Sequence, residues 1–180
     1  MTPTTPMALA AAALLALASP ALAHAPRTTQ ANLLDRVQIE DLLVDYYQPL
    51  GGNAGREALS DFFTEDGVID VNGRVYSGRA GIAQAYKDAG AANTGNPVFK
   101  GKFVMLMNNP RIAVRGNTAT VDAVWTGIVT TTPPEQPHLA EQGKEHDDLV
   151  KVKGEWMITK RIITSTGGLA PFYQVTFKDR

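Results

Sequence analysis

Apolar residues follow a helical period early in the chain. The spacing i, i+3, i+4, i+7 is met by Ile39, Leu42, Leu43, Tyr46, Tyr47 and Leu50. Asn32 precedes this stripe as an N-cap candidate, and Pro49 predicts that the helix ends near Tyr47. Shorter apolar patterns at 56–63 and 78–91 follow. The first half of the chain is therefore predicted to contain three helices.

Strand-forming residues dominate the rest of the chain and come in pairs joined by short turns. The predicted pairs are 68–71 with 74–77, 98–114 with 118–131, and 149–152 with 156–164. Asn72-Gly73 and Lys153-Gly154 suit tight hairpin turns, which need positive φ angles. Asn108-Asn109-Pro110 should interrupt its strand, because proline cannot donate a ladder hydrogen bond. The segment 131–142 is predicted to be an exposed loop that leaves His138 in solvent.

Composition narrows the class of protein. The 180 residues are 44% hydrophobic and 19% charged, with a formal net charge of -1 and no cysteine. These values suit one domain. They give no support for nucleic acid as a partner, which normally requires a basic surface, or for attraction to anionic membranes. The lack of cysteine excludes disulfides and thiolate catalysis.

The N-terminus resembles a secretion signal. Residues 7–18 read MALAAAALLALA, an apolar stretch too short to span a bilayer, and small residues before Ala23 and Ala25 offer cleavage sites. Residues 1–25 are therefore predicted to be a signal peptide, although no Lys or Arg precedes the apolar stretch. We expect a secreted or periplasmic domain at 26–180, with no membrane attachment after cleavage.

Four consecutive titratable residues begin the outer arm of the last hairpin: Glu145, His146, Asp147 and Asp148. Side chains alternate across a strand, so Glu145 and Asp147 point to one face while His146 and Asp148 point to the other. At most half of the cluster can line one pocket. No metal site is predicted for this reason, and a hydrated strand end that faces water remains an alternative.

From about Leu33 to Ser165 the chain resembles the SnoaL-like branch of the NTF2-like superfamily. The matching segments are DRVQIEDLLVDYY, DFFTEDGVIDVNGRVYSGRAGIAQAY, NNPRIAVRGNTATVDAVWTG and HDDLVKVKGEWMITKRIIT. This resemblance implies an α+β cone, in which a strongly curved antiparallel sheet packs against about three N-terminal helices and encloses an apolar cavity. Related enzymes include polyketide cyclases, dehydratases and ketosteroid isomerases, whereas other members only bind or assemble.

The resemblance also implies a catalytic set. Enzymes of the superfamily place a tyrosine on the first helix, an acid on the first hairpin, and an acid or histidine on later strands. Tyr47, Asp70, Glu145 and His146 match those places, and we expect them to approach one cavity. Tyr47 could equally be a core residue whose hydroxyl is satisfied locally.

Three further residues are candidates for substrate binding: Trp125, Tyr76 and Arg161. Either tryptophan of the chain could instead be a wall of the core. Arg161 could hold a substrate carboxylate, but pairing with Asp147 or Asp148 within the hairpin is the simpler account.

Two function classes stay open. The first is a cofactor-independent lyase or isomerase that transfers a proton on a small apolar or polycyclic substrate. The alternative is a non-catalytic module that binds a small apolar molecule or supports assembly. It rests on Gly52 and Gly55, which replace acids found in dehydratase-like members, and on the lack of a histidine in the strand before Asn109-Pro110. No cofactor is predicted, because the chain lacks a glycine-rich phosphate loop.

A homodimer is expected through a sheet face, since Val124, Trp125 and Ile128 supply apolar side chains on both faces of one strand.

Overall fold

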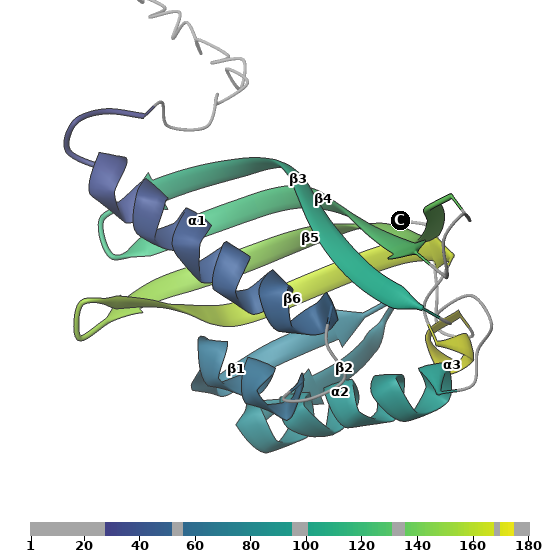
Figure 1. The fold of residues 1–180 in the computed structure, drawn as a ribbon. Coiled ribbons are helices and arrows are strands. Elements are labelled where there is room, and N and C mark those ends of the chain that lie inside the picture. Colours follow the sequence, from purple (N-terminus) through teal and green to yellow (C-terminus); the bar gives the residue numbers. More distant parts are fainter. Residues whose placement is uncertain (1–27, 52–55, 95–100, 131–135, 168–169, 175–180) are drawn as a thin grey trace, which may run out of the picture.

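A six-stranded sheet with helices on one face forms the body of the protein (Figure 1). The computed structural model describes residues 28–51, 56–94, 101–130, 136–167 and 170–174, and the predicted signal peptide lies outside these ranges. The elements in chain order are α1 (Leu33–Tyr47), η1 (Gln48–Gly51), η2 (Arg56–Phe62), β1 (Phe63–Val71), β2 (Arg74–Ser77), α2 (Gly78–Asn93), β3 (Lys102–Arg115), β4 (Thr118–Thr130), β5 (His138–Val152), β6 (Glu155–Gly167) and α3 (Pro171–Gln174).

The strand order is β2-β1-β6-β5-β4-β3. All neighbouring strands run antiparallel except β1 and β6, which are parallel, so the expectation of a purely antiparallel sheet is wrong at this pair. The cause is the chain path: β3 to β6 form a meander whose last strand returns beside β1. The sheet is curved, with α1 crossing the strands β3 to β6 and α2 lying beside β1 and β2 (Figure 1).

The expected count of about three N-terminal helices is wrong, because only α1 and α2 are α-helices of that part of the described chain. The segment expected as the second helix is the 3₁₀ helix η2. Its last expected residue, Phe63, is fully buried and already pairs with Ile158 in the sheet. This segment is a short connector that leads directly into β1, and short connectors commonly form 3₁₀ helices. Among the described residues, no helix is long and apolar enough to cross a membrane.

The predicted turns are confirmed. Asn72 and Gly73 have φ angles of 52° and 88°, and Lys153 and Gly154 have φ angles of 53° and 94°. Positive φ at both central residues defines the type I′ turn, whose twist suits a hairpin. The interruption expected near Pro110 is a bulge: the register with β4 shifts between residues 108 and 111.

Strand β5 is longer than predicted. It begins at His138, so the expectation of a loop through residue 142 is wrong. His138 pairs with Val129, and Leu139 pairs with Ile128 on β4. The backbone pairing offered by a long neighbouring strand outweighs the polar local sequence. His138 itself is exposed, as expected.

A polar contact ties the start of α1 to the β5–β6 hairpin. Lys151 Nζ lies 2.6 Å from Asp35 Oδ1, and the Trp156 indole N–H donates to the same oxygen over 3.2 Å. The Lys151 ammonium also lies 5.7 Å from the centre of the Trp156 ring. The hydrogen bond from Lys151 is the main cause that lowers the pKa of Asp35.

We expect Asp35→Asn to destabilise the protein by about 1 kcal/mol at neutral pH, the upper range for a partly exposed pair. A carboxylate with a lowered folded pKa stabilises the fold above its unfolded pKa of about 3.9, and this contribution is lost as the pH falls through the folded pKa. Urea unfolding at pH 7 and pH 3 measures the difference in unfolding free energy between the wild type and Asp35→Asn. Glu40→Gln, on an exposed site of the same helix, is the control. A difference that is equal at both pH values would contradict the ion pair.

Candidate functional site

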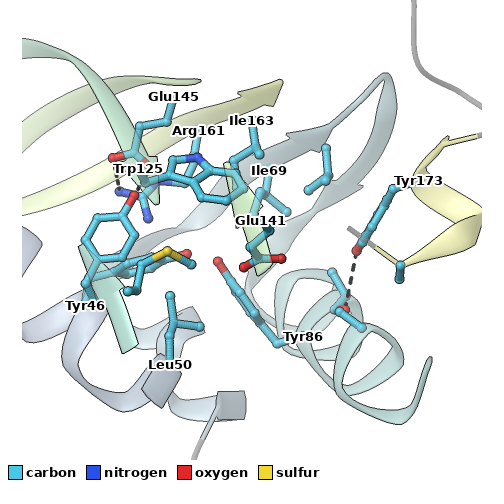
Figure 2. A pocket seen from close by; sticks show the side chains of 16 residues that line it. Tyr46, Leu50, Ile69, Tyr86, Trp125, Glu141, Glu145, Arg161, Ile163 and Tyr173 are labelled. Carbon is cyan, nitrogen blue, oxygen red and sulfur yellow. Dashed lines mark hydrogen bonds and ion pairs between the residues drawn. The ribbon is translucent and has the colours of Figure 1, made fainter. Parts of the chain in front are cut away.

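A cavity of about 110 Å³ lies between the helices and the inner face of the sheet (Figure 2). Its wall is mostly apolar and aromatic, with three titratable side chains from the central strands. The residues that define its character are Tyr46, Tyr47, Leu50, Ile69, Tyr86, Met105, Trp125, Glu141, Glu145, Arg161, Ile163 and Tyr173. Small-molecule sites in proteins commonly combine such walls with a few polar groups.

Arg161 anchors the polar end of the cavity. Its side chain is fully buried, and its Nε and Nη2 atoms each donate to Asp147 over 2.7 Å. The two residues are direct partners across β5 and β6. The guanidinium also lies 3.8 Å from the centre of the Tyr46 ring, in a cation–π contact. Pairing within the hairpin, which the sequence favours, is therefore confirmed with Asp147.

Glu145 is a second carboxylate near Arg161, and it is not part of the Arg161–Asp147 pair. It lies two residues before Asp147 on the same face of β5, is 4% exposed, and accepts a hydrogen bond from the Tyr47 hydroxyl. Its second oxygen, Oε1, lies 3.7 Å from Arg161 Nη2. Burial raises the pKa of Glu145 to about 7 against the opposing effect of Arg161, and the charge of Asp147 adds to the rise. Glu145 can thus gain or lose a proton near neutral pH.

Several polar atoms around the cavity have no hydrogen-bond partner among the described residues. They are Glu145 Oε1, Arg161 Nη1, Trp125 Nε1 and the hydroxyls of Tyr46 and Tyr86, and all five are buried. An unpaired buried polar group costs about 1–3 kcal/mol, so natural proteins keep few of them. Their concentration around one cavity indicates a place prepared for a polar ligand or for water.

Asp70 is not part of this cavity, so the expectation that it approaches Tyr47 and Glu145 is wrong. Its neighbours Ile69 and Val71 line the cavity, and strand alternation sends Asp70 to the opposite face. There its carboxylate accepts a hydrogen bond from the Gly73 N–H over 2.7 Å, which fastens the β1–β2 turn.

His146 also lies on the outer face of the sheet, and its expected place in the cavity is wrong for the same reason. Its Nδ1 atom lies 2.7 Å from Asp122 Oδ1, and its Nε2 atom lies 3.5 Å from Asp148 Oδ1. The hydrogen bond with Asp122 raises the pKa of His146. The two carboxylates flank opposite nitrogens and do not converge. Within the described ranges, no group of three His, Asp or Glu side chains is arranged to hold a metal ion.

The three residues predicted to bind substrate differ in their position relative to the cavity. Trp125 and Arg161 line the cavity. Tyr76 does not line it: it lies on β2, where its ring packs against the core and lies 5.7 Å from the Arg74 guanidinium. Sequence reasoning missed four lining residues that carry polar atoms: Tyr46, Tyr86, Glu141 and Tyr173. Tyr86 belongs to the apolar face of the predicted helix at 78–91, and Glu141 falls in the segment that was expected to be a loop.

Gly143 allows Trp125 to lie across β5. A Cβ atom at Gly143 would be 2.3 Å from Trp125 Cζ2, a distance that atoms never keep. The indole therefore covers the strand between residues 141 and 145. Any larger residue at 143 would force Trp125 to move.

The α+β architecture, a curved six-stranded sheet packed against helices, is that of NTF2-like proteins with a cystatin-like fold. Within it, the SnoaL-like domain family matches residues 31–162. The match spans most of the chain, so the protein belongs to the SnoaL-like domain family of the NTF2-like superfamily, as the sequence resemblance predicted. No match was found among curated proteins.

Solved structures agree on the fold. The "Putative Scytalone Dehydratase" of Novosphingobium aromaticivorans is 25% identical, with a TM-score of 0.60 over 77% of this chain and 89% of that one. An NTF2-like protein with a cystatin-like fold from the same organism is 19% identical, with a TM-score of 0.59 over 83% and 92%. The protein Aln2 from a Streptomyces species is 15% identical, with a TM-score of 0.63 over 74% and 91%.

We expect Glu145→Gln to gain stability relative to the wild type as the pH rises. A carboxyl whose folded pKa is raised favours the fold most below its unfolded pKa of about 4.3, and this contribution is lost as the pH rises through about 7. The gain should be roughly 1–3 kcal/mol between pH 5 and pH 8, since one pKa unit corresponds to about 1.4 kcal/mol. Urea unfolding at several pH values measures it. For the control Glu155→Gln, at an exposed site, the difference in unfolding free energy from the wild type should not change with pH. If the unfolding free energies of Glu145→Gln and the wild type changed with pH in parallel, the raised pKa would be refuted.

Proposed function

We propose that this protein is a cofactor-independent lyase or isomerase that uses Glu145 to move a proton on a small cyclic ketone or hydroxyketone. The observation that carries the proposal is the buried Glu145 carboxyl, whose pKa of about 7 lies at the edge of a largely apolar cavity. A general base works best when its pKa lies near the working pH. Perturbed carboxyls in clefts are typical of functional sites.

The reaction begins when ionised Glu145 takes a proton from the carbon beside the substrate carbonyl. The electron pair of the broken C–H bond moves into a C=C bond, and the carbonyl oxygen gains negative charge. Arg161 Nη1 and Trp125 Nε1 are buried donors without partners, and they suit a developing oxyanion. In a β,γ-unsaturated ketone, protonated Glu145 then returns the proton to the γ-carbon of the dienolate as the double bond shifts into conjugation, which is isomerisation. In a β-hydroxyketone it gives the proton to the hydroxyl on the β-carbon, which departs as water as the C–O bond breaks, and the reaction is a dehydration.

The Tyr47 hydroxyl supports this role through Glu145. It donates to Glu145 Oε2, and this hydrogen bond favours the ionised carboxylate. Tyr47 therefore positions the base and keeps its pKa from rising further. Tyr47 is not assigned to stabilise a substrate oxyanion, because its hydroxyl is directed to the carboxylate.

The size of the cavity limits the substrate. An apolar cavity of about 150 Å³ holds benzene, so about 110 Å³ suits no more than one six-membered ring. We therefore restrict the substrate class to single rings and leave out the polycyclic substrates that the sequence allowed. The similarity to a protein named as a scytalone dehydratase agrees with elimination of water as one outcome.

A non-catalytic binding module is the second candidate. Its support is that Asp70 and His146 lie outside the cavity, which leaves Glu145 without either expected catalytic partner. Binding of small ketones without any proton exchange would favour this second function.

We expect the wild type to exchange the α-protons of cyclohexanone with D₂O and to convert 3-hydroxycyclohexanone to cyclohex-2-enone. The rate should rise with pH through about 7, because Glu145 must be ionised to act as a base. Glu145→Gln should lower the rate by about 10²-fold or more. Tyr47→Phe should shift the midpoint of the pH profile upward, since it removes a hydrogen bond that lowers the pKa of Glu145.

Two matched controls separate this site from the outer face of the sheet. Asp70→Asn and His146→Gln change an acid and a histidine that lie outside the cavity, and both should keep the wild-type rate. NMR follows the exchange, and ultraviolet absorbance follows formation of the enone. Full activity of Glu145→Gln would end the proposal.

We also propose that two copies pair through the outer face of the sheet. Val124, Ile128 and Ile162 are half-buried apolar residues on that face, which α1 and α2 leave uncovered. Light scattering should give the mass of a dimer, and Ile162→Lys should shift it toward the monomer because a charge would be buried there. A monomer at high protein concentration would contradict this assembly.

A further inference from the structure

A groove of about 770 Å³ lies beside the cavity, and the proposed reaction does not use it. It runs between the end of α1 and the first half of β3, which is the last strand of the described sheet. Apart from Gln48 and Lys102, the side chains that line it are apolar or aromatic. The groove therefore offers an apolar surface several times larger than the cavity of about 110 Å³.

The groove and the cavity share a wall. Tyr47 and Met105 are the two residues that line both spaces. Tyr47 is held in place, because its hydroxyl donates to Glu145 and its ring lies edge-on to Tyr46, with 5.5 Å between the ring centres. Any passage between the two spaces at this wall therefore depends on Met105.

Met105 is the part of this wall that can move. Its side chain is half-buried and unbranched, and methionine adapts its shape more easily than other apolar residues. Its direct partner on β4 is Gly127, which has no side chain, and β3 has no neighbour on its other side in the described sheet. No directly paired side chain on a neighbouring strand holds Met105, so a change of its rotamer can join the cavity to the groove.

Exposed large apolar side chains gather along the groove. Val44 on α1 is 58% exposed, and Val104 and Leu106 on β3 are 51% and 43% exposed. Single exposed apolar residues are common, but groups of them mark binding sites, and edge strands usually avoid them. Val44 lies on the helix side of the sheet, so pairing of two copies through the outer face would not cover it. The groove thus suits an apolar ligand group.

We propose that the groove holds an alkyl chain of the substrate while the ring of the substrate lies in the cavity, and that Met105 is the gate between them. The substrate class is then a six-membered cyclic ketone or hydroxyketone with an unbranched alkyl substituent. This inference rests on the proposed function in taking the cavity as the site of the ring. The chain does not react: burial of its CH₂ groups, each contributing up to about fourfold in affinity, holds the ring beside Glu145.

The experiment measures dissociation constants of two probes for the full chain by calorimetry. The probes are cyclohexanone and 4-pentylcyclohexanone, which differ only in the chain. The wild type should bind the pentyl probe about tenfold or more tightly than cyclohexanone. In NMR spectra, the methyl signals of Val44 and Leu106 should shift with the pentyl probe and not with cyclohexanone, which places the chain in the groove.

A charge in the groove tests where the chain lies. Val44→Lys should remove most of the gain in affinity of the pentyl probe over cyclohexanone, because the ammonium group would have to lose water beside the chain. Val37→Lys is the matched control, since Val37 is another exposed apolar residue of α1 and lines neither space. It should keep the full gain.

Two substitutions at 105 test the gate. Met105→Phe puts a larger, stiffer side chain into the shared wall and should reduce the gain of the pentyl probe to about twofold or less. Met105→Leu conserves the volume and should keep the gain. The ratio of the two dissociation constants is compared within each variant, because a purely structural effect would weaken both probes equally and leave that ratio unchanged.

The outcomes separate this inference from the proposed function. A pentyl probe that binds no more tightly than cyclohexanone, or a gain that survives both Val44→Lys and Met105→Phe, overturns the inference even if Glu145-dependent proton exchange is observed. A groove that instead receives a second copy of the chain would show no gain, and Val44→Lys would lower the mass in light scattering. A gain that depends on Val44 and Met105 without any proton exchange supports the inference and refutes the enzyme.

Discussion

The chemistry of the cavity depends on one buried guanidinium that has two carboxylate neighbours. Arg161 gives both of its best-placed hydrogen bonds to Asp147, and this pair is electrically neutral. Glu145 is then an additional negative charge at 3.7 Å from an arginine that is already paired. Desolvating a charge is expensive unless it is matched one to one. The pKa of this additional carboxyl is therefore raised to about 7, and the same packing that stabilises the hairpin creates a buried group that can gain or lose a proton near neutral pH.

Strand alternation divides the titratable run at 145–148 between two environments. Glu145 and Asp147 face the core, where the dielectric response is weak and the pKa of Glu145 moves far from its solution value. His146 and Asp148 face solvent on the other side of β5, and they form a partly exposed network with Asp122. Residues adjacent in sequence thus belong to different sites, and only those two positions apart can act together.

The sequence predicts the local geometry better than the placement of the site. The turns at Asn72-Gly73 and Lys153-Gly154 follow from residues that accept positive φ, and the first helix follows from its apolar period. Strand alternation predicts that Glu145 and Asp147 share one face of β5, but it does not predict which face the helices cover. The inward direction of the Glu145 side chain therefore did not follow from the sequence pattern. For Asp70 the answer was present in its neighbours: Ile69 and Val71 are the more apolar pair, so their face is the buried one.

The long-range features could not be read from local patterns. The parallel pairing of β1 with β6 joins segments about 90 residues apart, and the early start of β5 depends on a partner strand rather than on its own polar residues. The buried position of Glu141 was not predicted for the same reason. A glutamate in a proline-rich, polar stretch suggests solvent, yet the space above Gly127 on the neighbouring strand takes its side chain into the core.

Two glycines on adjacent strands consequently determine what the cavity can hold. Gly127 makes room for Glu141, and Gly143 makes room for Trp125, so a carboxylate and an indole lie close against the sheet instead of filling the space beneath the helices. What remains is about 110 Å³, lined by the unpaired polar atoms of Arg161, Trp125 and Glu145 as well as by apolar side chains. Because packed interiors adjust little, a ligand must match this length and polarity rather than reshape the cavity. The curved sheet and the helices form the walls of the cavity, and these two positions without side chains provide the space that Glu141 and Trp125 occupy.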